Sequence, residues 1–284
     1  HGHHRRQRQM CIRDRFLVSA CANLPSSKTV ANCVFPSEEV FPGGVINYEF
    51  DSNGINIENS LYSDNLDFIV CESNKNIVNI IIPIPLSFEK KEVNFGVPGL
   101  FSASFPIKER YYRESRIEIK NKDLVNPPSS FNERISKEYA LGIKAKQTVS
   151  DRKLRNTKME MPLEGIISSE FGVRRFINNQ PRNRHVGLDI AADEGTPVIA
   201  PLKGEVIISD EFFYKGNVVY IDHGNGLVSS YSHLSERKVS TGDNVSKGQV
   251  LGYVGSTGRV TGPHLHWEIS LLGISLDPEI FVNQ

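Results

Sequence analysis

The C-terminal part of this 284-residue sequence is divided by glycines into short apolar runs. After Met161 these runs are PVIAP, GEVIIS, NVVYID, LVSSYSHL, QVLGYVG and HLHWEIS. Short runs rich in β-branched and aromatic residues, with turn residues between them, are typical of β-strands. The pair Asn225-Gly226 is a strong signal for a tight hairpin. The sequence therefore predicts a compact antiparallel β-fold for residues 159–284.

A second group of strand-like segments occupies residues 23–125. VINYEF follows the turn signal Pro42-Gly43-Gly44, and FIVCE, IVNIIIPIPL and SRIEIK come after it, separated by Asn, Gly and Ser clusters. This region contains no histidine and no convincing catalytic group. We therefore expect a mainly β chain with a small N-terminal β-domain. This domain is expected to serve as a packing, spacing or substrate-docking module. Whether this domain restricts access to a C-terminal site or docks substrate is left open.

Residues 126–158 are expected to form a helical connector. Ser130 and Glu133 have the spacing of a capping box, and apolar residues then recur every four positions at Phe131, Ile135, Tyr139 and Ile143. A free linker would have no use for an apolar stripe, so we expect this one to pack against one of the two domains. Gly142 weakens the helix by roughly 1 kcal/mol relative to alanine.

The first 22 residues read as a leader and not as part of the fold. HGHHRRQRQMCIRDR resembles translated adaptor sequence, and Val18-Ser19-Ala20-Cys21 matches the lipobox that precedes a lipidated cysteine in bacterial lipoproteins. Cleavage after Ala22 is the alternative. The sequence thus favours an exported, periplasmic protein anchored to a membrane by a lipid at Cys21, with the choice of inner or outer membrane open.

Charge and cysteine content agree with export. Without the five arginines and one aspartate of the adaptor-like segment, 28 basic side chains face 32 acidic ones, so nothing favours binding to nucleic acid. Cys33 and Cys71 are a candidate disulfide outside the cytoplasm, where two buried free thiols are the less favoured alternative.

The candidate chemistry lies in two short motifs. His264 and His266 stand two positions apart, so on a strand both side chains point to the same face. His185 and Asp189, about eighty residues earlier, are also an even number of positions apart in an extended segment. Two imidazoles and a carboxylate, with one coordination position left open, are what a catalytic zinc site requires.

Five blocks between residues 160 and 279 resemble the lysostaphin/LytM family of zinc endopeptidases. They are PLEGIISSEFGVRR, RHVGLDIAADEGTPVIAP, GNVVYIDHGNGLVSSYSHLS, GDNVSKGQVLGYVGSTG and TGPHLHWEI. The resemblance implies a fold related to the biotinyl/lipoyl hybrid fold, and one zinc ion per chain bound by His185, Asp189 and His266. It also implies that His264 and His233 are catalytic, one as the proton acceptor and one as a stabiliser of the oxyanion, with their order open.

Other residues near these motifs have simpler explanations. His223 lies in a turn and is interpreted as structural. Arg174, Arg175 and Arg184 are candidates for contacts with substrate carboxylates, although exposed arginines are usually solvated. GDNVSKGQVLGYV is similar to a half-motif of biotin or lipoyl carriers, but Lys247 is not in the context of a modified hairpin lysine, and a carrier has no use for the histidines.

The resulting hypothesis is a zinc-dependent endopeptidase that cleaves peptide cross-links between the stem peptides of bacterial peptidoglycan. A β-domain followed by a helical connector resembles cell-wall peptidases of Gram-negative bacteria, which favours D,D-endopeptidase activity. The alternative is a non-catalytic wall-binding activator of other hydrolases, and the complete ligand set argues against it. A regulatory protein partner and the oligomeric state are left open.

Overall fold

The computed structural model describes residues 27–31, 35–36, 39–52, 61–72, 76–152, 154 and 156–282. The leader with Cys21, and also Cys33, lie outside these ranges. Within them the chain is mainly β, as predicted, and most strand pairs are antiparallel. In the part of the chain that the structure describes, no helix has the length and apolar character needed to cross a membrane.

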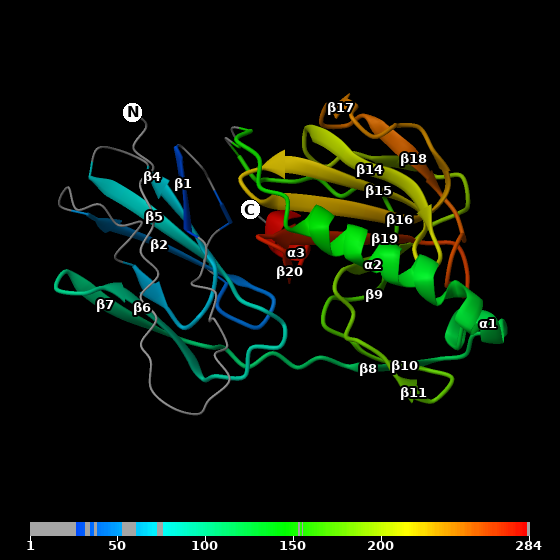
Figure 1. The fold of residues 1–284 in the computed structure, drawn as a ribbon, viewed down its shortest axis with the longest axis horizontal. Coiled ribbons are helices and arrows are strands. Elements are labelled where there is room, and N and C mark those ends of the chain that lie inside the picture. The colour runs from blue at the N-terminus through cyan, green and yellow to red at the C-terminus, as the bar shows by residue number, and fades with distance from the viewer. Residues whose placement is uncertain are drawn as a thin grey trace, which may run out of the picture.

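The N-terminal strands form two small sheets, seen in blue and cyan in Figure 1. Their bounds are β1 Ser27–Ala31, β2 Val45–Asp51, β3 Tyr62–Ser63, β4 Phe68–Glu72, β5 Ile77–Pro83, β6 Glu92–Val97 and β7 Phe101–Pro106. One sheet has the order β1-β4-β5-β2 and the other the order β3-β6-β7. Buried side chains from both sheets, among them Ile46, Phe68, Ile80 and Phe95, make one apolar core.

One cysteine of the expected disulfide falls in the described part. Cys71 on β4 is buried and disulfide-bonded. The other three cysteines of the chain lie outside the described residues, so the pairing with Cys33 stays a prediction.

The segment SRIEIK pairs with the C-terminal part of the chain and not with the N-terminal sheets. It overlaps β8 (Glu114–Ile117), which runs parallel to β10 (Arg174–Ile177), and β11 (Gln180–Pro181) completes this three-stranded sheet. Apolar residues of the short helix α1 (Lys122–Val125) and of its neighbours cover the strands in a small cluster of Ile119, Val125 and Ile177.

The connector helix exists, but its predicted apolar stripe packs only at its start, where the Phe131 ring lies 4.9 Å from the Phe213 ring and Ile135 is half-buried. A 3-10 turn, Ser129–Phe131, leads into α2 (Asn132–Lys146), and no side chain caps either start, so the expected capping box is not formed. Tyr139 is 68% exposed and Ile143 is 40% exposed. The buried residues of α2 are Gly142 and Ala145. A step of four residues overshoots the 3.6-residue turn by about 40°, so a stripe at that spacing rotates away from the packed face.

The C-terminal strands build one ten-stranded sheet system. Their bounds are β9 Ile166–Ser169, β12 Leu188–Ala191, β13 Pro197–Ile199, β14 Gly204–Phe212, β15 Gly216–Gly224, β16 Leu227–Arg237, β17 Asn244–Val245, β18 Val250–Val254, β19 Leu265–Leu271 and β20 Ile274–Leu276. The main path is β17-β14-β15-β16-β19-β12-β9, with β18 joined to β13 and β16, and β20 joined to β19. Asn225 and Gly226 both have positive φ (54° and 82°), so the predicted tight hairpin between β15 and β16 is confirmed.

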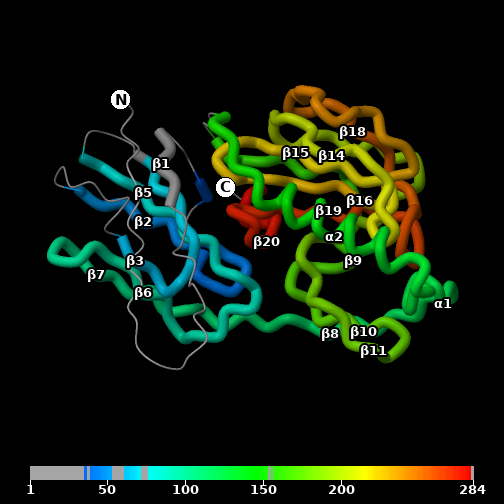
Figure 2. Tube along the Cα trace, in the orientation of Figure 1, coloured from blue at the N-terminus to red at the C-terminus, as the bar shows by residue number. Residues whose placement is uncertain are grey.

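The N-terminal sheet β1-β4-β5-β2 shares a hydrophobic core with the C-terminal sheet. Figure 2 traces the N-terminal strands beside β20 and the C-terminal end of the chain, where the helix α3 (Glu279–Val282) lies. Buried Val45, Ile69 and Ile81 belong to the same apolar cluster as Phe171 and Phe281. At Gly43, with φ of 96°, an added Cβ would stand 2.2 Å from the Phe171 ring, so glycine permits this close approach.

Candidate metal centre

The register of β12 against β19 places the first two site residues opposite each other. Asp189 pairs directly with His266 in this antiparallel ladder, so both side chains leave the same face of the sheet. His185 precedes β12 and is held in place by backbone hydrogen bonds to the segment around Val173: its N–H donates to Val173 O at 2.9 Å, and its carbonyl accepts from Gly172 N–H at 2.8 Å. The structure therefore brings His185, Asp189 and His266 together, as the sequence predicted.

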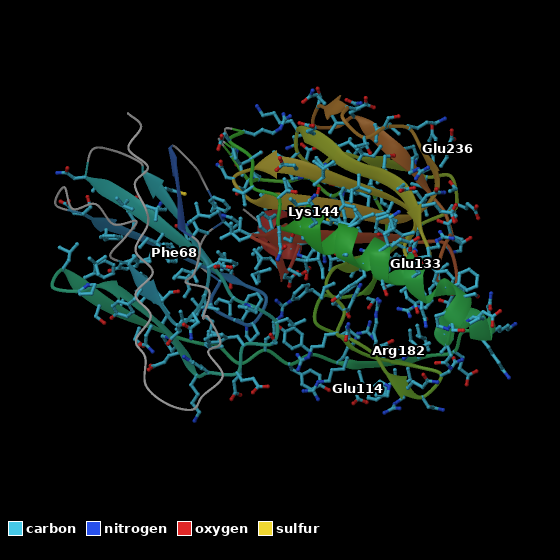
Figure 3. All side chains as sticks on the ribbon, in the orientation of Figure 1. Phe68, Glu114, Glu133, Lys144, Arg182 and Glu236 are labelled. Atoms are coloured by element: carbon cyan, nitrogen blue, oxygen red, sulfur yellow. The ribbon has the colours of Figure 1, made fainter. Side chains whose placement is uncertain are left out.

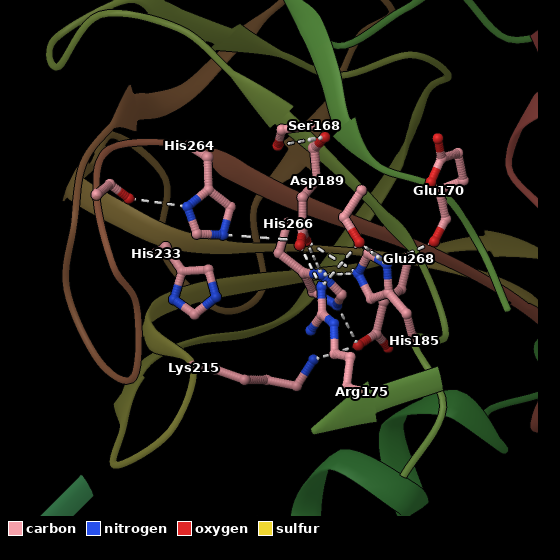
Figure 4. A network of polar contacts seen from close by, with 12 residues as sticks. Ser168, Glu170, Arg175, His185, Asp189, Lys215, His233, His264, His266 and Glu268 are labelled. Atoms are coloured by element: carbon pink, nitrogen blue, oxygen red, sulfur yellow. Dashed lines mark hydrogen bonds and ion pairs between the residues drawn. The ribbon is translucent and has the colours of Figure 1, made fainter. Parts of the chain in front are cut away.

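Three potential ligand atoms converge at this point (Figure 4). His185 Nε2 lies 2.9 Å from Asp189 Oδ1, His266 Nδ1 lies 2.7 Å from the same oxygen, and the two ring nitrogens are 2.9 Å apart. All three residues are buried. The opposite nitrogen of each ring is already engaged: His185 Nδ1–H donates to Glu170 O at 2.8 Å, and His266 Nε2–H donates to Glu268 Oε1 at 2.7 Å.

This donor set fits a zinc ion. Because each ring donates its proton away from the cluster, the electron pairs of two nitrogens and one carboxylate oxygen face one another, and such a group calls for a positive charge in its centre. Two histidines and one carboxylate are a common protein ligand set for zinc that keeps a fourth position open. Zinc bonds of about 2.0–2.1 Å would require the three atoms to separate by a few tenths of an ångström.

Electrostatics keep the ligands in the state that binds metal. Burial lowers the pKa of His185 to about 4, although Asp189 opposes this shift. Burial alone would raise the pKa of Asp189, but the close contacts of its carboxylate with the His185 and His266 rings outweigh burial and hold that pKa well below its usual value. At neutral pH His185 is therefore neutral and Asp189 is ionised.

His233 and His264 lie side by side at the edge of this cluster. Their ring centroids are 4.9 Å apart, and His264 Nε2 is 3.9 Å from Asp189 Oδ1. His264 Nδ1–H donates to Gly262 O at 2.9 Å, and His233 Nδ1–H donates to Thr257 O at 2.9 Å. Burial lowers the pKa of both rings, so each is neutral at neutral pH and offers Nε2 as a proton acceptor.

The backbone at His233 is in a conformation that non-glycine residues rarely adopt. Its φ is 68°, at a point of β16 close to where the pairing with β15 shifts register, between Asn217 and Val219. Its N–H donates to Lys215 O at 2.8 Å, which fixes the turned backbone. Left-handed φ in a buried histidine is a feature that clusters at functional sites.

One side chain of the cluster was missed from the sequence, and another has a different partner from the one expected. Glu268 stands two positions after His266 on β19, so the spacing that pairs His264 with His266 continues to this acid and could have indicated it. Burial would raise the pKa of Glu268, but Lys146 and Lys215 outweigh burial and hold the pKa well below its usual value. Arg175 on β10 was expected as a candidate for contacts with substrate carboxylates, but it forms an ion pair with Asp189 Oδ2 and leaves Oδ1 to the histidines.

The remaining residues singled out in the sequence lie elsewhere. His223 ends β15, where Nδ1–H donates to Lys203 O at 2.8 Å and Nε2 accepts from Ser229 Oγ at 2.7 Å. Arg184 has its guanidinium 5.4 Å from the centre of the Tyr112 ring, and Arg174 is exposed. The geometry gives His223 a complete set of structural partners outside the metal cluster.

Comparison with known proteins decides the family. The model of peptidase family M23 matches residues 183–278. The crystal structure of a candidate M23 peptidase from Pseudomonas aeruginosa aligns with 86% of this chain and 95% of its own, at 30% identity and a TM-score of 0.63. The chain belongs to peptidase family M23. The resemblance to lysostaphin/LytM enzymes seen in the sequence is thereby confirmed.

Two peptidoglycan enzymes match part of this M23 protein. The peptidoglycan DD-endopeptidase ShyC of Vibrio cholerae is 41% identical over 130 residues, which are 45% of this chain and 30% of ShyC. The DD-carboxypeptidase/endopeptidase Mpg of Neisseria meningitidis is 44% identical over 112 residues, which are 39% of this chain and 26% of Mpg. The match covers less than a third of either relative.

Proposed function

We propose that this M23 protein is a zinc-dependent endopeptidase that hydrolyses peptide cross-links of bacterial peptidoglycan. The observation that carries the proposal is the convergence of His185 Nε2, Asp189 Oδ1 and His266 Nδ1 beside two neutral histidines. The activities for which ShyC and Mpg are named support peptidoglycan as the substrate and favour D,D-endopeptidase specificity. The stem peptides of the wall would then be the binding partner.

The roles of the residues follow from their tautomers. His185, Asp189 and His266 would hold zinc, which when bound supplies a Lewis acid that makes water nucleophilic at neutral pH. His264 and His233 each present an unprotonated Nε2, so either ring can accept the proton of the attacking water and deliver it to the leaving amine. Once protonated, the same nitrogen becomes an N–H donor that can stabilise the oxyanion.

We further propose the arrangement of the whole protein. Residues 159–284 would be the peptidase domain, residues 126–158 the connector and residues 23–125 an accessory β-domain. A peptidoglycan substrate places the enzyme outside the cytoplasm, and the lipobox favours a lipid anchor at Cys21 in the periplasm.

The decisive experiment is digestion of purified sacculi by the full chain. The expected result is release of monomeric muropeptides from cross-linked dimers, identified by mass spectrometry, with loss of the reaction in a chelator and recovery on adding zinc. The D,D assignment predicts cleavage between D-alanine and meso-diaminopimelate. Release of glycan fragments without loss of cross-links would contradict the proposal.

A further inference from the structure

An acid buried beside the metal cluster joins three elements of the fold. The Glu268 side chain is 5% exposed and lies on the same face of β19 as His264 and His266. Its Oε1 accepts from His266 Nε2–H at 2.7 Å and from Lys215 Nζ at 2.7 Å. Figure 4 shows Lys215 reaching toward this carboxylate from the turn between β14 and β15.

The second oxygen of Glu268 is held by the connector helix. Lys146, in the last turn of α2, places Nζ 2.5 Å from Glu268 Oε2, and only 19% of this lysine side chain is exposed. The same Nζ is 3.4 Å from Ser275 Oγ on β20. A buried carboxylate needs such partners, because removal from water disfavours its charge.

The two lysines act on different parts of the site. Lys215 binds Glu268 through its side chain, while its carbonyl accepts the N–H of His233 at 2.8 Å. Lys146 occupies Oε2, so Oε1 remains directed at His266 Nε2. With its proton committed to Glu268, the His266 ring is fixed in the tautomer whose free Nδ1 faces His185 and Asp189.

We propose that Glu268 is a positioning residue of the metal centre and that Lys146 makes the connector helix α2 a working part of the same centre. The inference rests on the proposed zinc site. It adds Lys146 to that site, a residue outside the segment 183–278 that the family model matches. A carboxylate behind a metal-binding histidine orients the ring and makes it a stronger ligand. Helix α2 thus does more than connect two domains: it helps set the affinity of the centre for metal.

The test measures zinc affinity of the full chain by competition with a chelator. Glu268→Gln should weaken zinc binding by about 10- to 100-fold, the usual effect of removing such a partner. Lys146→Met should weaken it in the same direction, and Lys146→Arg should restore it, because arginine keeps the charge. The control is Lys144→Met, which removes the same charge from an exposed position in the same turn, labelled in Figure 3.

A second readout separates positioning from loss of structure. Cobalt bound in place of zinc reports ligand geometry in its visible spectrum, and Lys146→Met should shift that spectrum while Lys144→Met should not. If Glu268→Gln fails to fold, the double variant Glu268→Gln/Lys215→Met replaces it, because removing one charge of each sign keeps the charges balanced. Its zinc affinity is then measured in the same way. Wild-type affinity and an unchanged cobalt spectrum in Lys146→Met would overturn the role of α2.

Failure of the zinc site itself would look different. A wild-type chain that binds no zinc would overturn the proposed function and not only this inference. The metal-free protein still tests the hydrogen bond, because the nitrogen NMR shifts of His266 distinguish its tautomers. Nε2 should carry the proton in the wild type, and a proton on Nδ1 alone would overturn the positioning role of Glu268.

Discussion

At the scale of single residues, the site depends on which nitrogen of each ring is free. His185 offers Nε2 and His266 offers Nδ1, because the opposite nitrogen donates to Glu170 O in one ring and to Glu268 Oε1 in the other. The acceptor behind each histidine therefore determines which ring nitrogen is free. The geometry leads to separate predictions for the ligands and for their neighbours.

The first prediction concerns the ligands. We expect about one zinc per wild-type chain and a large loss of bound zinc in His185→Ala, Asp189→Ala and His266→Ala, because each substitution removes one of three protein ligands. Elemental analysis of the purified, folded proteins measures this ratio. Full zinc occupancy in any one variant would remove that residue from the ligand set.

The second prediction concerns the two neighbouring histidines. His233→Ala and His264→Ala should keep zinc but lose about 10²- to 10⁴-fold in turnover, because a positioned proton-transfer group contributes a factor of that size. Turnover on a soluble cross-linked muropeptide, measured beside the zinc content, checks it. Loss of metal from either variant would instead make that histidine a ligand.

The third prediction uses His223, whose interpretation is structural. Burial lowers its pKa from 6.5 to about 4, and only Lys203 O and the nearby Asp222 oppose this. The unfolded chain therefore binds the proton first as pH falls. The stability contributed by neutral His223 is complete above about pH 6.5 and is lost between there and pH 4, on the order of 3 kcal/mol.

Urea unfolding of the metal-free protein across this pH range measures the effect. As pH decreases, the free energy of unfolding of His223→Gln should fall less steeply than that of the wild type. Its zinc affinity should stay unchanged. Parallel curves for the two proteins would show that His223 titrates normally in the folded chain.

The sequence predicted the histidines and the aspartate of the site, but not the side chains that support them. Period-two spacing on a strand identified His264 and His266, and the same spacing extends to Glu268, which the sequence analysis did not consider. Lys146 could not be found this way, and neither could the pairing of Arg175 with Asp189. Their positions depend on how α2 and β10 pack, and no local pattern records that packing.

At the scale of the elements, strands were easier to predict than the packed face of the connector helix. The runs such as NVVYID and LVSSYSHL became β15 and β16, since turn residues bound them on both sides. Helix α2 was also expected, but its buried side is made by the small residues Gly142 and Ala145. Small residues give no signal in a search for apolar stripes, although they allow close approach to a neighbouring element.

The fourth prediction follows from this close approach. A Cβ at position 142 would already lie 3.1 Å from Tyr220 Oη, so Gly142→Leu should overpack the contact and destabilise the fold by about 1–3 kcal/mol. Tyr139→Ser, on the exposed side of the same helix, should change stability by less than about 0.5 kcal/mol. Thermal unfolding of both variants compares the two faces. A larger loss in Tyr139→Ser would show that the exposed stripe is packed after all.

At the scale of the whole molecule, the N-terminal sheets are joined to the peptidase sheet by more than a linker. Val45, Ile69 and Ile81 contribute to the core that contains Phe171 and Phe281. Deleting the N-terminal residues would therefore expose apolar surface and change the stability of the remaining protein. A changed cleavage rate in such a truncated protein would then have two explanations, altered stability and altered access of the substrate. Point substitutions at the junction test the coupling more cleanly.

The fifth prediction concerns Asp277, which connects both parts at the junction. Its N–H donates to Gly43 O at 2.8 Å, and its carboxylate, 1% exposed, lies 2.6 Å from Arg110 Nη1. Arg110→Met leaves this buried charge without its ion-pair partner, so we expect a loss of about 3 kcal/mol, near the low end for broken buried pairs because Arg110 is itself 30% exposed. Adding Asp277→Asn should recover part of the loss, since it removes the stranded charge.

Arg116→Met, which breaks the exposed pair with Glu114, is the matched control and should cost less than about 1 kcal/mol. Urea unfolding of the wild type and the three variants compares these losses, and equal losses in Arg110→Met and Arg116→Met would mean that the junction pair does not couple the two parts.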